Sequence, residues 1–582
     1  LFVVFFILIP VLSNQKPEPL PKEMVLYVQF DGPIPEFYQP SGLSSLFDDP
    51  EMTMRDLIDT IYLAAGDKNV KGLVARMDHA PASLTQAHEL RSALLAFKEA
   101  GKFTTIYSSS YGEAGGGLAS YYLASSFDEI WMQPMGIVSI PGLNAEMPFA
   151  RAALDKIGVT PNFYQRKEYK SAYENFTNEE MSSYNRETLE RLIGDIREDI
   201  LSVVPAQRGL EPKVFDDYVN QGLFTAQEAL DAKLVDRLDY ADIMIDEIKE
   251  KVGKKDAEIE DVFVSIDRYA SDALNKEKQS NNIFHKKPGV ALIYAVGAIV
   301  PESDEGSPLG GGSQLAAADE IAPAIMDAVD DPDIKAIVLR IDSPGGSPTA
   351  SESILRAIER AQEKNIPVIV SMGGVAASGG YWIAAYADQI FVMPSTITGS
   401  IGVVGGKVAL QDLWDKLGIN WQGVRWGENS GIWSTNTPFS KSEEERVNAM
   451  LDAIYDGFIS RVAEGRNLDK DVVDGLAGGR VWSGKRAVEI GLADQIGDLN
   501  NALDYAADLV NQTNRRGVNI YVYPEVKSGW EYFADLMEGQ ATLGQYFAQM
   551  HDILTFISPL NEAARQAQSP QDYMVHEPVR LR

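Results

Sequence analysis

A single serine in a run of small residues is the first candidate for chemistry in this sequence. Ser378 stands in GGVAASGGYW, residues 373–382, where glycine and alanine leave its hydroxyl uncrowded. A serine hydroxyl is inert at neutral pH unless a positioned base removes its proton. Histidine is the usual base, but none of the five histidines lies near Ser378 in the chain: His79, His88, His285, His551 and His576. The search for a function therefore becomes a search for the base.

Two glycine-rich turns could supply the hydrogen-bond donors that acyl transfer requires. They are SPGG, residues 343–346, and SGG, residues 378–380. Glycine lets backbone N–H groups point into a site without side-chain obstruction, and two such groups can stabilise a tetrahedral oxyanion. Gly379 would supply one donor, and Gly346 or Gly345 the other. Either turn alone is more typical of a tight strand-to-helix connection, so their joint presence is what favours acyl-transfer chemistry.

The composition limits the class of protein. The chain has 582 residues, of which 45% are apolar, so it is long enough for two to four globular domains. Its net charge of −32 leaves no dominant basic surface, so nucleic acid is not an expected partner. The absence of cysteine excludes disulfides, thiolate nucleophiles and cysteine metal sites. We expect no cofactor and no metal ion.

The first twelve residues, LFVVFFILIPVL, are almost entirely apolar. A helix that spans a bilayer needs about 20 such residues. We interpret residues 1–12 as the remnant of a truncated transmembrane anchor, and the polar, proline-rich residues 13–22 as a tether. A signal-peptide core or a buried strand are the alternatives for the apolar run.

The chain is predicted to be a divergent tandem duplication. Four blocks of sequence recur in the same order at nearly constant offsets of 258 to 264 positions, which is the signature of an internal repeat. VKGLVARMD, for example, returns as IKAIVLRID. The four pairs of blocks are residues 70–78 with 334–342, 121–134 with 381–394, 154–159 with 414–419, and 224–236 with 482–494.

Each repeated unit alternates apolar strands with amphipathic helices, which predicts an α/β fold. In the second unit we expect strands at 335–342, 366–372 and 388–393, and a helix at 380–387. Between the units charge rises and periodicity weakens, as in a linker. The predicted boundaries are a first unit at 23–250, a linker at 251–288, a second unit at 289–525 and a C-terminal tail at 526–582.

The glycine-rich residues 303–314, SDEGSPLGGGSQ, are expected to form a mobile surface loop, because three adjacent glycines hold no single conformation cheaply. A phosphate-binding loop is the alternative, but no Lys-Ser/Thr pair follows the glycines.

The two units have kept different residues. At an offset of 260, Ser378 aligns with Leu118, and Gly379 aligns with Ala119. The SPGG turn aligns with His79, Ala80, Pro81 and Ala82. The first unit therefore lacks both the serine and the glycine turn.

Three motifs of the second unit resemble the signal peptide peptidase A family, also called protease IV. They are SPGGS at 343–347, MGGVAASGGYW at 372–382 and TGSIGVVG at 398–405, and in the first unit YKSAYENFT at 169–177 looks like the family's lysine motif. The resemblance covers nearly the whole chain beyond the apolar N-terminus. It implies two tandem domains with the fold of Clp protease and crotonase, a superhelix of ββα turns, as in the larger bacterial form.

The resemblance implies a serine–lysine dyad in which Lys170 is the general base for Ser378 and Ser400 orients the lysine. The duplication adds a check, because at an offset of 260 Lys170 aligns with Ser430 and Ser400 with Ile140. Each unit has thus kept one partner, and the site is expected where the units meet. Burial there would have to lower the pKa of Lys170 from about 10.4 to near 7. Repulsion from Arg166 and Lys167 could contribute; the alternative is that both side chains simply face solvent.

The resemblance also implies a setting. The expected substrates are cleaved signal peptides and other unfolded apolar segments, bound in an extended conformation. The expected location is the bacterial inner membrane, with the catalytic body in the periplasm. A homotetramer is the implied assembly.

Three other functions compete with this interpretation. An α/β-hydrolase would need His551 or His576 as its base, and AASGG only half matches the nucleophile elbow. A crotonase-like acyl-CoA enzyme is compatible with the implied fold, although no basic patch for the adenine phosphates stands out. A non-catalytic scaffold that binds apolar peptides is the third. A penicillin-binding S-x-x-K site is excluded because Tyr381 stands where that lysine would be.

Overall fold

The computed structural model describes residues 19–38, 51–78, 83–113, 116–280, 287–303 and 315–524. We call residues 19–280 the first half and residues 287–524 the second half. Several expectations concern residues outside these ranges: the anchor at 1–12, most of the tether, the loop that follows Ser303, the tail at 526–582, and His79, His285, His551 and His576. Among the described residues no helix is both long and apolar enough to cross a membrane.

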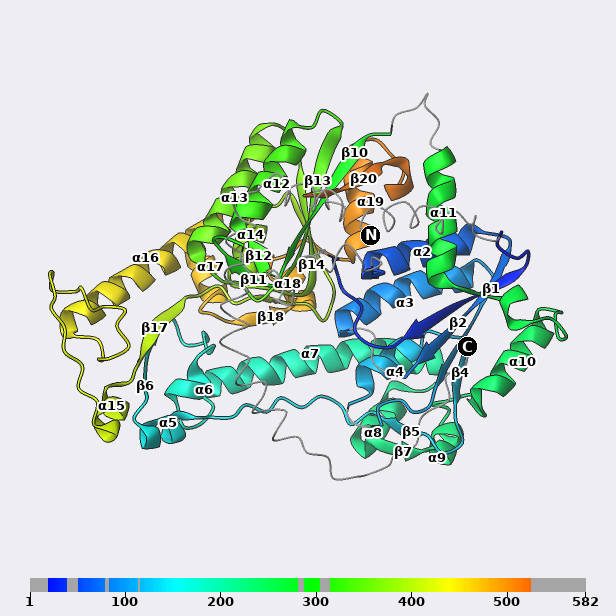
Figure 1. Ribbon diagram of the computed structural model, residues 1–582, viewed down its shortest axis with the longest axis horizontal. Helices are drawn as coiled ribbons and strands as arrows, with labels where there is room; N and C mark the ends of the chain where they lie inside the picture. The colour runs from blue at the N-terminus through cyan, green and yellow to red at the C-terminus, as the bar shows by residue number, and fades with distance from the viewer. Residues whose placement is uncertain are drawn as a thin grey trace, which may run out of the picture. The chain divides into compact units, whose positions relative to one another are not determined.

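The first half contains a six-stranded parallel sheet with the strand order β8-β4-β3-β2-β1-β9 (Figure 1). Its strands are β1 (Met24–Phe30), β2 (Val70–Met77), β3 (Phe103–Ser108), β4 (Glu129–Met132), β8 (Arg237–Leu238) and β9 (Phe263–Ser265). β5 (Ile137–Ser139) and β7 (Leu223–Thr225) form a separate antiparallel pair. The helices are α2 (Met54–Gly66), α3 (Leu84–Glu99), α4 (Leu118–Ala124), α5 (Arg151–Ile157), α6 (Glu174–Thr177), α7 (Ser183–Arg208), α8 (Pro212–Gln221), α9 (Ala226–Asp231), α10 (Ala241–Lys251), the 3-10 helix η2 (Ile259–Asp261) and α11 (Ile266–Ser280).

The second half contains an eight-stranded sheet with the order β18-β16-β14-β13-β10-β20, in which β15 also pairs with β14 and with β19. Its strands are β10 (Gly289–Val296), β13 (Ile334–Ser343), β14 (Val368–Ala377), β15 (Gln389–Val392), β16 (Ile397–Gly399), β18 (Val481–Ser483), β19 (Gln495–Ile496) and β20 (Asn519–Tyr523). β11 (Ala298–Val300) and β12 (Leu315–Ala317) form a separate parallel pair. The helices are α12 (Ala318–Asp330), α13 (Pro348–Glu363), α14 (Gly379–Ala384), α15 (Gln411–Leu417), α16 (Lys441–Arg466), α17 (Lys470–Leu476), α18 (Gly484–Glu489), α19 (Leu499–Leu509) and the 3-10 helix η3 (Arg515–Gly517).

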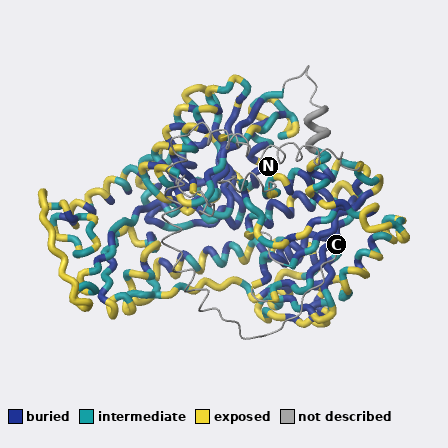
Figure 2. Tube along the Cα trace, in the orientation of Figure 1, coloured by how far each residue is buried: buried dark blue, intermediate teal, exposed yellow. Residues whose placement is uncertain are grey.

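Helices cover both faces of each sheet. In the second half, Leu339 packs into a large cluster with residues of α12 and α13, whereas its neighbour Val338 packs into a smaller cluster with α19. The first half repeats the pattern, with Leu73 facing α2 and α3 and Val74 facing α10. Alternate residues of a strand point to opposite faces, so these apolar runs are buried on both sides (Figure 2). The predicted α/β class is confirmed as a mixed α/β fold with parallel sheets.

The two halves pack into one compact unit. β6 (Thr160–Gln165) of the first half pairs antiparallel with β17 (Val404–Ala409) of the second half, as Figure 1 shows. Elsewhere between the two halves, Ser483 donates its hydroxyl to Asp195 on α7 at 2.6 Å, and Lys485 pairs with Glu198 at 2.8 Å. The segment that follows β6 is therefore held against the second half.

The expected strand at 335–342 is confirmed as part of β13, and the expected strand at 388–393 is confirmed as the slightly shorter β15. The expected strand at 366–372 is longer, because β14 continues through the glycines to Ala377. Its register against β13 shifts after Ile341, and beyond the shift β14 pairs with β16 instead of β15. The expected helix at 380–387 is α14, which begins directly after Ser378 and ends earlier.

Part of the predicted linker at 251–288 belongs to the first half. β9 pairs with β1 at the edge of the sheet, and Val264, Ile266 and Tyr269 are buried in the core. A strand of only three residues is too short to show a period-two pattern in the sequence. The other unit boundaries stay a prediction.

Candidate active site

Ser378 occupies the sharp connection between β14 and α14. Its φ of +55° and ψ of −118° lie outside the regions that side-chain-bearing residues normally adopt, and such a conformation costs about 1–3 kcal/mol. The Ser378 N–H donates to the Gly399 carbonyl at 2.9 Å, which holds the turn. Position 379 requires glycine, because a Cβ there would lie 2.6 Å from Ser351 Oγ. Strained strand-to-helix turns of this kind present nucleophilic serines in hydrolases.

Lys170 reaches this serine from the other half of the protein. Its Nζ lies 3.0 Å from Ser378 Oγ, 2.9 Å from the Ser400 carbonyl oxygen and 2.9 Å from Ser400 Oγ. Lys170 is only 6% exposed. The structure thus brings together three predicted site residues, of which Lys170 and Ser378 are 208 positions apart in the chain.

Backbone hydrogen bonds to the second half hold the segment that carries Lys170 in this position. Directly after β6, the Arg166 N–H donates to the Val403 carbonyl at 2.9 Å, and the Tyr169 N–H donates to the Gly478 carbonyl at 3.0 Å. Both acceptors belong to the second half. The segment that ends at Lys170 is therefore fixed by the half that carries Ser378.

Burial lowers the pKa of Lys170 from 10.5 to about 8, because the ammonium form loses its hydration there. Repulsion from Arg166 and Lys167, one of the two alternatives for these residues, does not contribute to the lowered pKa of Lys170, which burial causes. Arg166 pairs with Asp452, and Lys167 Nζ lies 2.7 Å from Asp474 Oδ2. Both positive charges are directed to acidic partners of the second half, so they do not act on Lys170.

The three candidate oxyanion donors differ in their surroundings. The Gly345 N–H donates to Ser343 Oγ at 3.1 Å. A Cβ on Gly379 would lie 3.0 Å from the Gly346 nitrogen, so the Gly346 and Gly379 amides are close neighbours beside Ser378. The arrangement favours Gly346 over Gly345 as the partner of Gly379. Gly345 instead shapes the turn, with a φ of +99° that suits glycine.

The histidine that the structure describes, His88, contacts side chains of the first half. His88 Nε2 lies 2.7 Å from Asp199 Oδ2, and Tyr122 contacts the same ring nitrogen at 2.8 Å. The described ranges contain no group of three or more histidine, aspartate or glutamate side chains that could hold a metal ion.

Comparison with known proteins identifies the family. Residues 96–255 and 360–513, together more than half of the chain, match the model of peptidase family S49. The chain belongs to peptidase family S49.

Relatives with established names support this membership. Protease 4 of Haemophilus influenzae is 33% identical to this S49 peptidase over 471 residues, which cover 78% of this chain and 73% of the relative. Protease 4 of Salmonella typhi is 32% identical over 468 residues, with coverage of 79% and 72%. The chloroplastic serine protease SPPA of Arabidopsis thaliana is 29% identical over 462 residues, with coverage of 79% and 66%. The predicted resemblance is confirmed, and this S49 peptidase is a serine protease.

The geometry of this S49 peptidase suits acyl transfer. A separation of 3.0 Å between an amine nitrogen and a hydroxyl oxygen is within the range over which a general base takes a proton. The amine can do so only when it is neutral. A pKa of about 8 leaves a useful neutral fraction near physiological pH.

Sequence reasoning missed two glycines that pack on the lysine of this S49 peptidase. A Cβ on Gly479 would lie 2.5 Å from Lys170 Cβ, and a Cβ on Gly402 would lie 3.3 Å from Lys170 Cδ. They let the second half close over the lysine stem and exclude water. A signal was present, because at the 258-position offset Gly479 aligns with Gln221. The comparison of units that singled out Ser378 could have singled out Gly479 too.

Proposed function

We propose that this S49 peptidase is an endopeptidase that works through a serine–lysine dyad, with Ser378 as the nucleophile and Lys170 as the general base. The observation that carries the proposal is the 3.0 Å separation of Lys170 Nζ and Ser378 Oγ at a place where the amine is shielded from water. Ser400 orients the lysine through two hydrogen bonds.

In the proposed first step, neutral Lys170 takes the Ser378 proton while Oγ attacks the carbonyl carbon of the scissile peptide bond. The N–H groups of Gly379 and Gly346 stabilise the oxyanion that forms. The Lys170 ammonium then donates its proton to the leaving amine, and the acyl group stays on Ser378. In the second step Lys170 deprotonates a water molecule, which hydrolyses the ester and restores the free serine.

Cleaved signal peptides and other unfolded apolar peptides are the proposed substrates. The support is the resemblance of residues 343–347 and 398–405 to the signal peptide peptidase A motifs. The same proposal includes a membrane anchor at residues 1–12, a location at the bacterial inner membrane with the catalytic body in the periplasm, and a homotetramer.

We further propose that the chain consists of two tandem Clp/crotonase-like units, the first starting at 23 and extending beyond 250 to include β9, and the second at 289–525. The strand order β8-β4-β3-β2-β1-β9 of the first sheet corresponds, element by element, to the path β19-β15-β14-β13-β10-β20 of the second. The long helices α7 and α16 both have 26 residues and begin 258 positions apart. These correspondences support the duplication that the sequence indicates.

The proposed dyad predicts how the rate depends on pH. We expect kcat/KM for a fluorogenic peptide to rise with pH through a midpoint near 8, because only the neutral amine of Lys170 accepts the serine proton. Below the midpoint the rate should fall about tenfold per pH unit. A profile without a midpoint between neutral pH and 10.5 would show that Lys170 does not titrate in the rate-limiting step.

Ser400→Ala is expected to lower kcat about tenfold with the fold intact, since it removes one of the hydrogen bonds to Lys170, about 1 kcal/mol, and leaves the backbone carbonyl. Ser395→Ala is the matched control. Ser395 lies close by in the chain and is buried, and its hydroxyl has no partner among the described residues. Equal kcat values for the two variants would contradict the orienting role.

Peptide cleavage separates the proposed enzyme from a binding scaffold. A quenched fluorescent peptide with the apolar core of a signal peptide should be cleaved by the wild-type protein. Ser378→Ala should still bind it, measured by fluorescence anisotropy, without cleaving it. Acid quenching of the wild-type reaction should leave an acyl group on Ser378 that mass spectrometry detects. Binding without cleavage by the wild-type protein would support the scaffold instead.

A further inference from the structure

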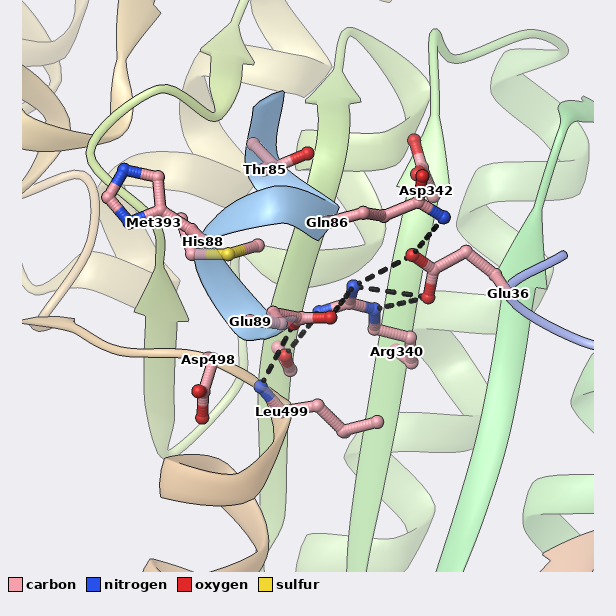
Figure 3. A network of polar contacts seen from close by, with 12 residues as sticks. Glu36, Thr85, Gln86, His88, Glu89, Arg340, Asp342, Met393, Asp498 and Leu499 are labelled. Atoms are coloured by element: carbon pink, nitrogen blue, oxygen red, sulfur yellow. Dashed lines mark hydrogen bonds and ion pairs between the residues drawn. The ribbon is translucent and has the colours of Figure 1, made fainter. Parts of the chain in front are cut away.

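A buried ionic network joins the two halves at a second place, apart from Lys170. Arg340 on β13 is 0% exposed, and Figure 3 shows its guanidinium between the carboxylates of Glu36 and Glu89. It donates to Glu36 from Nε and Nη2 at 3.1 Å each, and to Glu89 from Nη1 and Nη2 at 2.9 and 3.2 Å. Nη1 also donates to Ser371 Oγ at 3.0 Å. Arg340 belongs to the second half, whereas both glutamates belong to the first.

The network holds more acidic groups than basic ones in a place that water hardly reaches. Glu36 and Glu89 are both buried, and burial raises the pKa of Glu89 to about 8. Asp498 lies close to Glu89, and burial raises its pKa too. Well-packed apolar residues in place of a buried ion pair are often as stable or more stable. The free energy of folding alone therefore does not account for this arrangement, and a role in fixing one docking geometry does.

Arg340 lies on the strand that leads directly to the reacting groups. Two residues further along β13, the Asp342 carboxylate accepts hydrogen bonds from the Gly374 and Val375 N–H groups at 3.2 and 3.1 Å. These bonds fix the register shift of β14, which ends at Ser378. β13 itself ends three residues before Gly346. Short, rigid segments thus connect Arg340 to both Ser378, the nucleophile, and Gly346, a candidate oxyanion donor. A shift of Arg340 would therefore move both.

The partners of Arg340 lie on rigid parts of the other half. Glu89 is on α3, whose start is fixed by a capping box of Ser83 and Gln86. Gln86 also donates to Glu36 at 3.1 Å, so the two carboxylates are held in one frame. Glu89 accepts a further bond from the Leu499 N–H, at the start of α19, at 3.3 Å. The network therefore connects the sheet of the second half to the frame of the half that carries Lys170.

We propose that Arg340 is a positioning residue of the peptidase reaction, which binds Glu36 and Glu89 and thereby sets β13 and β14 at the place where Lys170 reaches Ser378. The inference rests on the serine–lysine dyad proposed above. Misplacement of reacting groups by about 1 Å lowers a rate about 10²-fold. A looser interface would also admit water to Lys170 and raise its pKa.

Arg340→Lys is the first test, because the lysine amine keeps the positive charge but cannot make the paired hydrogen bonds by which the guanidinium binds both glutamates. We expect kcat for the fluorogenic peptide to fall at least about tenfold. The midpoint of the pH–rate profile should move from about 8 towards 10.5, since Lys170 becomes hydrated. A purely structural role would lower the melting temperature without moving this midpoint.

Arg208→Lys is the matched control. Arg208 is also buried and forks to the Asp236 carboxylate at 2.8 and 3.0 Å, but both residues belong to the first half. This variant should lower the melting temperature and leave kcat and the pH midpoint unchanged. Equal effects of Arg208→Lys and Arg340→Lys on kcat and midpoint would overturn the proposal.

A triple variant, Arg340→Met with Glu36→Gln and Glu89→Gln, keeps the test decisive if Arg340→Lys does not fold. It removes the charges of Arg340 and of both glutamates that bind it together, so neither glutamate is left as an unpaired carboxylate. We expect a folded protein with a low kcat and a raised midpoint. A triple variant with wild-type kcat and midpoint would overturn the proposal. Activity of Lys170→Met would refute the dyad instead, whatever the Arg340 variants do.

Discussion

Lys170→Met is expected to lower peptide hydrolysis by about 10²- to 10⁴-fold, the usual contribution of a general base. Methionine is similar in length and apolar, so it suits a position that is 6% exposed. The variant should be at least as stable as the wild-type protein at neutral pH, because burial already disfavours the lysine ammonium there. Ser378→Ala should lower the rate at least as far. Both rates are measured as kcat with a fluorogenic peptide, beside thermal unfolding.

Lys407→Met is the control for burial. Lys407 lies on β17, is also 6% exposed, and has a pKa that burial lowers. Its Nζ lies 4.3 Å from the centre of the Phe439 ring and has no hydrogen-bond partner among the described residues. We therefore expect wild-type kcat for Lys407→Met. An active Lys170→Met variant, or an equal loss in both lysine variants, would refute Lys170 as the base.

Gly479→Ala is expected to lower kcat by about 10²-fold while the protein stays folded. The new Cβ would lie 2.5 Å from the backbone nitrogen and the Cβ of Lys170, so the lysine or the strand beside it has to move. A displacement of about 1 Å at a reacting group has an effect of this size. The measurement is kcat together with the pH midpoint, which should rise as water enters beside Lys170.

Gly478→Ala is the control that separates the effect of a steric overlap with Lys170 from the effect of backbone strain. Gly478 and Gly479 both have positive φ, +67° and +83°, so alanine is strained at either position. A Cβ on Gly478, however, would meet its nearest atom, Lys167 Cβ, at 3.6 Å, an ordinary contact distance. Gly478→Ala should therefore lower the melting temperature and keep kcat within a few-fold of wild type. Comparable losses of kcat in both variants would point to strain rather than to contact with Lys170.

The sequence predicted the class of fold because its signals are local. The strand at 335–342 is a run of β-branched and aliphatic residues, and it forms most of β13. The glycines of the site are local as well, since Gly379 and Gly345 are required by close approach or by a positive φ at their own positions. The extension of β14 to Ala377 could not be predicted in this way, because glycine is rare in strands and Asp342, on another strand, stabilises the register shift.

The sequence by itself also predicted which residues react, through the motifs around Ser378, the family resemblance that indicated Lys170, and the reciprocal loss of residues between the two predicted repeats. It could not determine that Arg166 and Lys167 turn away to Asp452 and Asp474, or that Gly479 closes over Lys170. Only the tertiary structure decided these points. The pKa of Lys170 is low because segments far away in the chain exclude water from its amine. The 3.0 Å separation of Lys170 Nζ and Ser378 Oγ, two residues 208 positions apart, depends on how the two halves dock.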